Sequence, residues 1–491
     1  MLKHLALLAL LITTPASATN VVFILADDLG MMDIGFNNPA AFTETPRLDG
    51  LAARSVRFTQ AYAASPVCSP TRSAILTGQA PARTRHSDYF GAVNGFGVIP
   101  SDYDPARHGV FGSYKDRPVL PAPYIERLGS EQVTLATIFR EFGYATMHAG
   151  KWHLGPEDCW PEHRGFDVNK GGHTIGGPYG GDNYFSPYGN PRLEDGPAGQ
   201  HLPDRLACEV TDFIGENKDR PFLVYLSFYS VHTPLIGRKD LVEKYRKKKA
   251  ALGLKAAFGS EPPRKNRLVQ EHAVYAAMVG AMDQAVGTVL DALEEHGIAE
   301  KTIVVFFSDN GGLSTSEGSP TSNLPFRAGK GWVYEGGIRV PMLVRWPGIT
   351  ADGSVCNTPV VATDFAPTLL EACGLPARPQ QHLDGVSLVP LLRGKEFTHG
   401  PLYWHYPHWG NQGGIPASAV RQGPWKLIRF HWKKPFELYH LADDPGELIN
   451  RTASEPDKVA ELSALLDAYL RETKALLPSP NPNPRMPFES W

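Results

Sequence analysis

The segment NVVFILADDLG, residues 20–30, joins an uninterrupted apolar run to two neighbouring carboxylates. A continuous apolar run of this length is typical of a strand that is buried on both faces of a sheet. Asp27 and Asp28 follow the run directly, and open α/β sheets place their sites at the carboxyl ends of such strands. The segment therefore predicts a central strand with a functional site at its end.

Further apolar runs alternate with helical patterns along the chain. Strands are predicted at 145–150, 221–230, 302–307 and 340–346, and helices at 46–55, 134–144, 204–217, 271–296 and 364–373. This alternation favours an α/β fold with a large, mainly parallel mixed sheet that is covered by helices on both faces. The stretches 80–130 and 155–203 are rich in Gly, Pro and aromatic residues, and inserts of this length are usually functional loops.

The pattern of predicted strands and helices changes after about residue 395. Short aromatic strands, such as those at 402–406 and 425–430, precede a helical pattern at 457–473. We expect a small C-terminal subdomain with an antiparallel sheet and a helix. The predicted organisation is a signal peptide at 1–18, a catalytic domain at 19–395, and the C-terminal subdomain with its tail at 396–491.

The first eighteen residues have the pattern of a secretory signal peptide, with Lys3, an apolar run at 5–12 and the small residues Ala16-Ser17-Ala18. The apolar run is too short to cross a bilayer, and we predict no membrane span. The sequence thus predicts an exported protein, periplasmic or extracellular, that is cleaved near Ala18. Its net charge of −3 over 491 residues argues against a nucleic-acid partner.

The five cysteines are an odd number, which in an exported protein leaves one thiol over. If one of them, Cys68, is consumed by a modification, four remain. These could form up to two disulfides or stay as buried thiols; they are Cys159, Cys208, Cys356 and Cys373.

A second pair of oxygen donors, Asp309 and Asn310, follows the predicted strand at 302–307 in the same way that Asp27 and Asp28 follow the first strand. Three carboxylates and an amide oxygen suit a hard divalent cation, Ca²⁺ or Mg²⁺, and suit zinc poorly because neither His nor Cys joins them. A large number of ligands in flexible geometry favours Ca²⁺. The sequence therefore predicts a calcium site at this edge of the sheet.

Basic side chains follow the other strands. Lys151 and His153 follow the strand at 145–150, and their spacing of two directs them to the same side. His232 follows the strand at 221–230, and Lys330 lies in a Gly-rich loop before the strand at 340–346. A Lys beside a His suits anion binding combined with proton transfer.

The segment SPVCSPTRSAILTG, residues 65–78, predicts a helix that begins near Cys68. Pro70 suits the first turn of a helix and Gly78 can end it. Arg72 then lies on the same face as Cys68, at a helix N-terminus that favours anions. The pair is interpreted as a nucleophile beside an anion clamp.

The Cys-x-Pro-x-Arg pattern of this segment, followed by Thr77-Gly78, resembles the activation motif of the type I, formylglycine-dependent sulfatases of the alkaline phosphatase-like superfamily. The resemblance extends to the Gly-rich segment 329–341 and to segments 420–428 and 437–445. It implies that a maturation partner, a formylglycine-generating or an anaerobic sulfatase-maturating enzyme, oxidises Cys68 to the aldehyde Cα-formylglycine.

The resemblance also implies the site and its mechanism. The calcium ligands would be Asp27, Asp28, Asp309, Asn310 and the modified Cys68, and the remaining active-site residues would be Arg72, Lys151, His153, His232 and Lys330. The hydrated aldehyde would attack sulfur, His232 would protonate the leaving oxygen, and His153 would take the proton from the second hydroxyl, which expels sulfate. The predicted activity is the hydrolysis of sulfate esters.

A sulfated saccharide is the predicted substrate, because the long aromatic loops suit sugar rings. Seven loop residues are candidate substrate contacts: Arg85, His86, His173, Asp182, Asn183, His405 and His408. The segment that contains His405, His408 and Trp409 is expected to extend over the cleft.

Two other functions compete with this interpretation. The first is a phosphate monoester or diester hydrolase of the same superfamily; its dinuclear zinc form would need additional His and Asp ligands, a pattern that the sequence does not display. The second is a catalytically silent binder of sulfated glycans. Such a binder would be expected to have lost Cys68, Arg72 or a lysine, whereas the chain has all of them.

Overall fold

The computed structural model describes residues 19–92, 94–101, 116–432, 435–482 and 484–485, so the predicted signal peptide at 1–18 lies outside the described residues. Within them, nine strands form the main sheet. These strands are β1 (Asn20–Ala26), β2 (Val56–Tyr62), β6 (Ala145–Gly150), β7 (Val168–Lys170), β8 (Phe222–Ser227), β11 (Thr302–Ser308), β12 (Arg339–Arg345), β13 (Val355–Cys356) and β14 (Val360–Val361).

The strand order of the main sheet is β13-β2-β12-β11-β1-β8-β6-β7, with β14 also paired to β2. Strands β11, β1, β8, β6 and β7 are mutually parallel, whereas β12 is antiparallel to both β11 and β2. Strand β2 therefore runs in the same direction as β1. As a result, the carboxyl ends of β2, β11, β1, β8 and β6 and the amino end of β12 meet at one edge.

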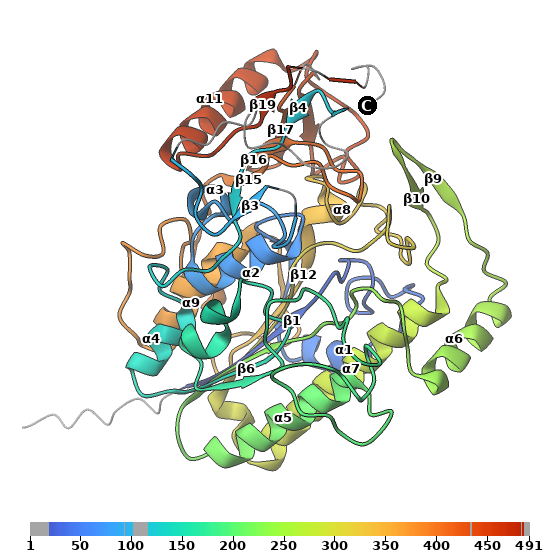
Figure 1. Cartoon of the computed structure of the whole chain (residues 1–491), viewed down its shortest axis with the longest axis vertical. Coiled ribbons are helices and arrows are strands. Elements are labelled where there is room, and N and C mark those ends of the chain that lie inside the picture. The colour runs from blue at the N-terminus through green and yellow to red at the C-terminus, as the bar shows by residue number, and fades with distance from the viewer. Residues whose placement is uncertain (1–18, 93, 102–115, 433–434, 483, 486–491) are drawn as a thin grey trace, which may run out of the picture.

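Helices cover both faces of this sheet (Figure 1). Val21, Phe23 and Leu25 of β1 join one apolar core, and Val22 and Ile24 join the other, as the two-residue period of a strand requires. The first core contains side chains of α2 (Cys68–Thr77), α4 (Leu135–Glu141) and α9 (Phe365–Ala372). The second contains side chains of α1 (Pro46–Ala52), α5 (Leu202–Asn217) and α7 (Ala273–Glu295). The predicted α/β class is confirmed.

Helix α7 is the one described helix that is long and apolar enough to cross a membrane. However, 72% of its most apolar 18-residue window is buried inside the protein, where it packs on α1, α5 and α6 (Lys239–Ala251). The Asp283 carboxylate accepts hydrogen bonds from the backbone N–H groups of Arg47, at 3.1 Å, and Leu48, at 2.8 Å. These are the contacts of a core helix.

The C-terminal part of the chain forms an antiparallel sheet of β15 (Leu402–Tyr406), β16 (Ala417–Gln422), β17 (Trp425–Phe430) and β18 (Glu437–His440). One face packs on α11 (Pro456–Glu472) through Leu462 and Leu466. The other face packs through Trp404 on Tyr62 and on α8 (Glu335–Ile338) of the main domain. This sheet and α11 lie at the top of Figure 1, and they confirm the predicted small antiparallel subdomain.

Short elements occupy the loops. They are α3 (Pro81–Thr84), α10 (Val389–Leu392), β3 (Gly95–Phe96), β4 (Val119–Leu120), β5 (Tyr124–Ile125), β9 (Phe258–Glu261), β10 (Arg264–Arg267), β19 (Ser479–Pro480) and the 3₁₀ turns Glu157–Cys159, Pro161–His163, Ala299–Lys301 and Ala362–Asp364. Strands β9 and β10 form a hairpin that projects from the molecule (Figure 1).

A buried ion cluster fixes the C-terminal sheet to the main domain. The Lys426 ammonium of β17 lies 3.0 Å from Glu335 Oε1 and 2.8 Å from Glu447 Oε1, and all three side chains are shielded from solvent. Tyr62 donates a hydrogen bond to Glu335 at 2.7 Å. Burial alone would raise the pKa of Glu335, but Lys426 and nearby arginines lower it to about 2. The interface therefore depends on paired buried charges.

We expect Lys426→Met to lower the free energy of unfolding by about 3–5 kcal/mol, because two carboxylates would remain buried with one cation removed. Lys458→Met is the matched control: its ammonium pairs with Glu461 on the surface, and its loss should cost less than about 1 kcal/mol. Urea denaturation of both variants measures the difference. Equal, small losses would contradict the structural role of Lys426.

Candidate active site

The motifs predicted at strand ends meet at one edge of the main sheet. Asp27 and Asp28 follow β1, Lys151 follows β6, and Asp309 follows β11. Gly150, at the end of β6, has φ +98°, and a Cβ there would lie 1.9 Å from the Ser227 carbonyl oxygen. The same carbonyl accepts the backbone N–H of Lys151 at 2.7 Å. Glycine at position 150 thus allows the close approach to β8 in which the Lys151 N–H binds the Ser227 carbonyl.

Helix α2 begins at Cys68, as the sequence predicts, and ends at Gly78 with φ +63°. The Arg72 guanidinium connects the first turn of α2 to the ends of three strands by hydrogen bonds. It donates to Asp309 Oδ2 after β11 at 2.8 Å, to Ser227 Oγ in β8 at 2.6 Å and to the Lys151 carbonyl after β6 at 3.0 Å. Because Arg72 is fully buried, its role in this structure is to position residue 68.

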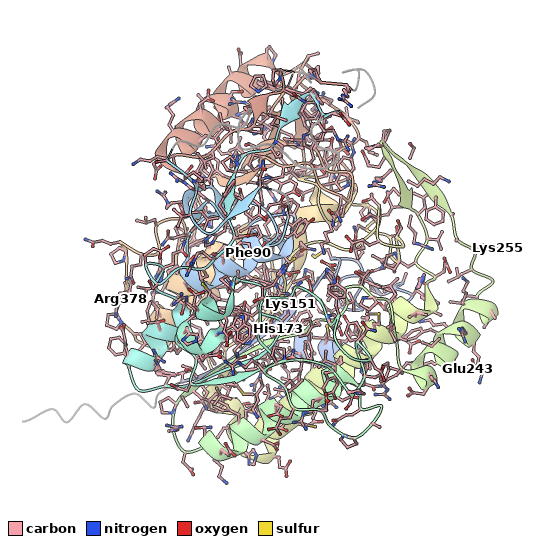
Figure 2. The ribbon with its side chains drawn as sticks, viewed as in Figure 1. Phe90, Lys151, His173, Glu243, Lys255 and Arg378 are labelled. Atoms are coloured by element: carbon pink, nitrogen blue, oxygen red, sulfur yellow. The ribbon has the colours of Figure 1, made fainter. Side chains whose placement is uncertain are left out.

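Three buried carboxylates face three buried cations at this edge. Lys151 donates to Asp27 at 2.7 Å, Lys330 donates to Asp28 at 2.8 Å, and Arg72 pairs with Asp309. Figure 2 shows Lys151 near the centre of the molecule, far from the exposed Lys255 and Glu243. Each charge therefore has a partner, without which its burial would be costly.

The oxygen donors at this edge fit a divalent cation. Ligand atoms of Asp27, Cys68 and Asp309 lie within 4.8 Å of one another. Asp27 Oδ1 and Asn310 Oδ1 are buried without a hydrogen-bond partner among the described residues, and buried oxygens normally have one. A hard cation would satisfy buried oxygens of this kind, and carboxylate and amide oxygens are the donors that Ca²⁺ or Mg²⁺ prefers.

A second trio, Asp28, His232 and Glu317, also has ligand atoms within 4.8 Å of one another. The sequence did not reveal this set, since Glu317 lies in a loop. However, the Lys330 ammonium already donates to Asp28 Oδ2 at 2.8 Å. Asn310 Nδ2 also donates to the other Asp28 oxygen at 2.8 Å, whereas Asp27 Oδ1 has no hydrogen-bond partner among the described residues. The open oxygen favours a single ion on the Asp27 side.

The two histidines of the site each direct one ring nitrogen inward. His153 Nε2 lies 2.8 Å from the Phe90 carbonyl, and His153 Nδ1 lies 3.6 Å from Cys68 Sγ. Because a carbonyl only accepts, Nε2 carries the proton and Nδ1 is free to accept one. His232 Nδ1 lies 2.8 Å from the Thr233 carbonyl, which by the same reasoning leaves Nε2 facing the site.

Burial shifts the protonation of these groups. It lowers the pKa of His153 and His232 well below the ordinary value, with Lys151 and Lys330 respectively acting in the same direction. Burial also raises the pKa of the Cys68 thiol. In this state both imidazoles are neutral and residue 68 is a thiol.

A pocket of about 340 Å³ adjoins residue 68. It is lined by Cys68, Tyr89, Phe90, His153, Gly176, Tyr179, His232, Thr233, Glu317, Lys330, Asn411 and Gln412. A larger hollow of about 770 Å³ is lined by residues such as Phe36, Arg57 and Lys248 and contains none of the strand-end motifs. The chemistry therefore belongs to the smaller pocket.

The seven predicted substrate contacts do not line this pocket. His405 is buried in the C-terminal subdomain, where its ring nitrogens lie 2.7 Å from Ser418 Oγ and 3.0 Å from the Leu476 carbonyl. His408 is also buried and lies 2.9 Å from Ser87 Oγ. The expected extension of 405–409 over the cleft is corrected accordingly: the pocket is reached by the next residues, Asn411 and Gln412.

The other five candidates also lie outside the pocket wall. His86 is buried with Nδ1 2.6 Å from Ser73 Oγ, and burial lowers its pKa to about 4. His173 supports the site through its backbone carbonyl, which accepts the His153 N–H at 3.2 Å. Arg85 is partly exposed after α3, and Asp182 and Asn183 lie in a surface turn.

Eight of the twelve wall residues were not among the sequence candidates, and Tyr179, Glu317 and Gln412 are three of them. The composition of 155–203 marked the loop of Tyr179, but not that residue. No pattern in the sequence distinguished Glu317. Its position between Asn310 and Lys330, both assigned to the site, is the one signal that could have drawn attention to it.

A sulfatase family model matches residues 19–375, and a model described as N-sulphoglucosamine sulphohydrolase, C-terminal, matches residues 328–475. The chain belongs to the sulfatase family. It is 32% identical to a sulfatase of Formosa agariphila, with 93% of this chain and 89% of that protein covered, and 30% identical to human arylsulfatase A, with 89% and 83% covered.

The fold of this sulfatase is similar to that of Ps i-CgsB in complex with k-i-k-neocarrahexaose, with a TM-score of 0.73, 27% identity, and 95% of this chain and 94% of that chain covered. The family resemblance seen in the sequence is confirmed. The protein is accordingly an enzyme, a sulfuric ester hydrolase.

We expect His405→Gln to lower stability by about 1–2 kcal/mol, because it disrupts hydrogen bonds inside the subdomain. The KM for a sulfate ester should stay within about twofold of the wild-type value, because His405 lies outside the pocket. Steady-state kinetics and thermal denaturation of one preparation separate the two effects. A large rise in KM with unchanged stability would instead place His405 in contact with substrate.

Proposed function

We propose that this sulfatase removes sulfate from a sulfated saccharide by means of a formylglycine at position 68 and one bound Ca²⁺. The observation that carries the proposal is the joint placement of Cys68, His153, His232 and Lys330 in one pocket, directly beside the oxygen-donor cluster. The relative in complex with k-i-k-neocarrahexaose supports a saccharide as substrate.

The ion would be held by Asp27, Asp28, Asp309, Asn310 and residue 68, and when bound it supplies Lewis-acid polarisation of the reacting oxygens. Arg72 keeps residue 68 beside this cluster through its bonds to three strand ends. Lys330 extends from the pocket wall to Asp28 and would offset negative charge on the sulfate oxygens.

The two histidines would divide the proton transfers between them. His153 Nδ1 faces residue 68 and would accept the proton of its hydroxyl when the aldehyde is restored. His232 Nε2 would give a proton to the oxygen of the departing sugar. An anionic sulfate ester beside the ring would favour its protonated form, because nearby negative charge raises a histidine pKa.

The proposal extends to biogenesis and location. A maturation enzyme would oxidise Cys68, and the aldehyde gives a hydrate whose second hydroxyl lets sulfate leave by C–O cleavage. We propose that the enzyme is exported to the periplasm or beyond the cell, on the basis of the pattern at residues 1–18.

Cys68→Ala should lower kcat by at least about 10³-fold, because it removes the nucleophile while it leaves the fold intact. Wild-type protein co-expressed with a maturation enzyme should show the aldehyde mass in the peptide that contains residue 68. Activity and the fraction of aldehyde should rise together over preparations with different degrees of maturation. Full activity with an unmodified thiol would refute the mechanism. Release of phosphate rather than sulfate from matched aryl esters would favour the phosphoesterase.

Calcium should stabilise the enzyme, by about 2.7 kcal/mol at a concentration 100-fold above its Kd, because it satisfies buried oxygens that lack partners. Thermal denaturation in EGTA, Ca²⁺ or Mg²⁺ measures this effect independently of activity. Asn310→Ala should weaken the response to Ca²⁺, whereas Asn357→Ala, on the surface beside β14, should keep it. Identical melting curves in EGTA and in Ca²⁺ would argue against the site.

A further inference from the structure

Away from residue 68, the pocket wall contains little positive charge. Among the described residues that line it, Lys330 is the one Lys or Arg, and its ammonium is committed to Asp28 at 2.8 Å. The rest of that wall consists of the two site histidines, other aromatic side chains, small and amide side chains, and the carboxylate of Glu317. A second anionic group on the substrate would therefore meet negative charge there.

Glu317 and Gln412 form a hydrogen-bonded pair across this wall. Gln412 Nε2 donates to Glu317 Oε1 at 2.7 Å. Within the described part of the chain, no other side chain hydrogen-bonds the Glu317 carboxylate, and Gln412 Oε1 is buried without a partner. Gln412 Oε1 faces Gly331 rather than the pocket, so the second Glu317 oxygen is the acceptor that remains for a ligand, and Gln412 holds that carboxylate in place.

The main chain holds this pair in place. The Gln412 carbonyl accepts hydrogen bonds from Thr315 Oγ1 at 3.0 Å and from Trp332 Nε1 at 3.2 Å. Thr315 precedes Glu317 by two residues, so the same bond fixes both partners. Acceptors fixed in advance lose little freedom when they bind a ligand.

The pair lies on the side of the pocket where the sugar must leave. A Glu317 oxygen is within 4.8 Å of a ring nitrogen of His232, the residue assigned to protonate the departing oxygen. Tyr179, 55% exposed, lies against His232 with its hydroxyl 3.3 Å from Nδ1. A carboxylate acceptor and an exposed aromatic ring therefore flank the same place, as sugar hydroxyls and a sugar face require.

We propose that Glu317, held by Gln412, selects the sugar: its carboxylate accepts hydrogen bonds from hydroxyl groups of the ring that bears the ester and repels a second sulfate or carboxylate on that ring. This inference rests on the proposed function and narrows its substrate to a singly sulfated, otherwise neutral sugar unit. Specificity of this kind combines an attractive contact for one ligand with a repulsive contact for its competitor.

The experiment compares wild type with Glu317→Gln, which keeps the size of the side chain and removes its charge. The probes are 4-nitrophenyl sulfate, the monosulfates of galactose and glucose, and the disulfates of the same sugars. Sulfate release gives kcat/KM for each, and ratios between probes within one preparation cancel differences in folding or maturation. Glu371→Gln, an exposed carboxylate on α9, is the matched control.

Wild type should prefer at least one monosulfate over its disulfates by about tenfold or more. In Glu317→Gln, that preference should fall about tenfold. The ratio of kcat/KM for the monosulfate to kcat/KM for 4-nitrophenyl sulfate should also fall about tenfold, as expected for the loss of a charged hydrogen bond. Gln412→Met should lower the ratio of monosulfate to 4-nitrophenyl sulfate, and Glu371→Gln should change neither this ratio nor the preference for the monosulfate.

Unchanged ratios in Glu317→Gln would overturn the inference, as would a wild-type enzyme that cleaves 4-nitrophenyl sulfate but none of the monosulfates, or that prefers disulfates. A protein with verified formylglycine that releases sulfate from no probe would instead refute the proposed function itself.

Discussion

The active site depends on buried ion pairs between three carboxylates, at the ends of β1 and β11, and three cationic side chains from elsewhere in the chain. Arg72, Lys151 and Lys330 each pair with one of Asp309, Asp27 and Asp28. An unpaired charge at this depth would cost several kcal/mol, so the position of each group constrains the others. The network therefore locates α2, the end of β6 and the Gly-rich loop together, and with them the pocket.

The topology of the sheet makes this network possible. Because β12 runs against its two neighbours, the chain reaches the same edge both on leaving β2 toward Cys68 and on entering β12 after Lys330. A wholly parallel sheet would place the entry to that strand at the opposite edge. One reversed strand thus adds a cation to a site otherwise built from strand ends.

The sequence revealed the elements whose neighbours are uniform. The apolar runs of β1 and β11 predicted both the strands and the residues that follow them, because both faces of a buried strand contact apolar side chains and the residues between its ends must then be apolar. Strand β2, VRFTQAY, was not predicted, since the polar and partly buried Arg57, Thr59 and Gln60 interrupt its apolar pattern. The directions of His405 and His408 also could not be predicted, because partners such as Ser418 and Ser87 decide them.

Two kinds of constraint therefore act on the two walls of the pocket. Buried ion pairs form the wall beside residue 68, and a substitution of one member would leave the charge of its partner buried and unpaired. Another part of the wall takes Glu317 from a loop and Gln412 from the C-terminal subdomain. The ion pairs of Lys426 with Glu335 and Glu447 hold that subdomain against the main domain. Glu317 also adjoins the ion network, because one of its oxygens lies within 4.8 Å of ligand atoms of Asp28 and His232. The choice of the sugar is thus made next to the chemistry of the ester, and the subdomain contributes to it through Gln412.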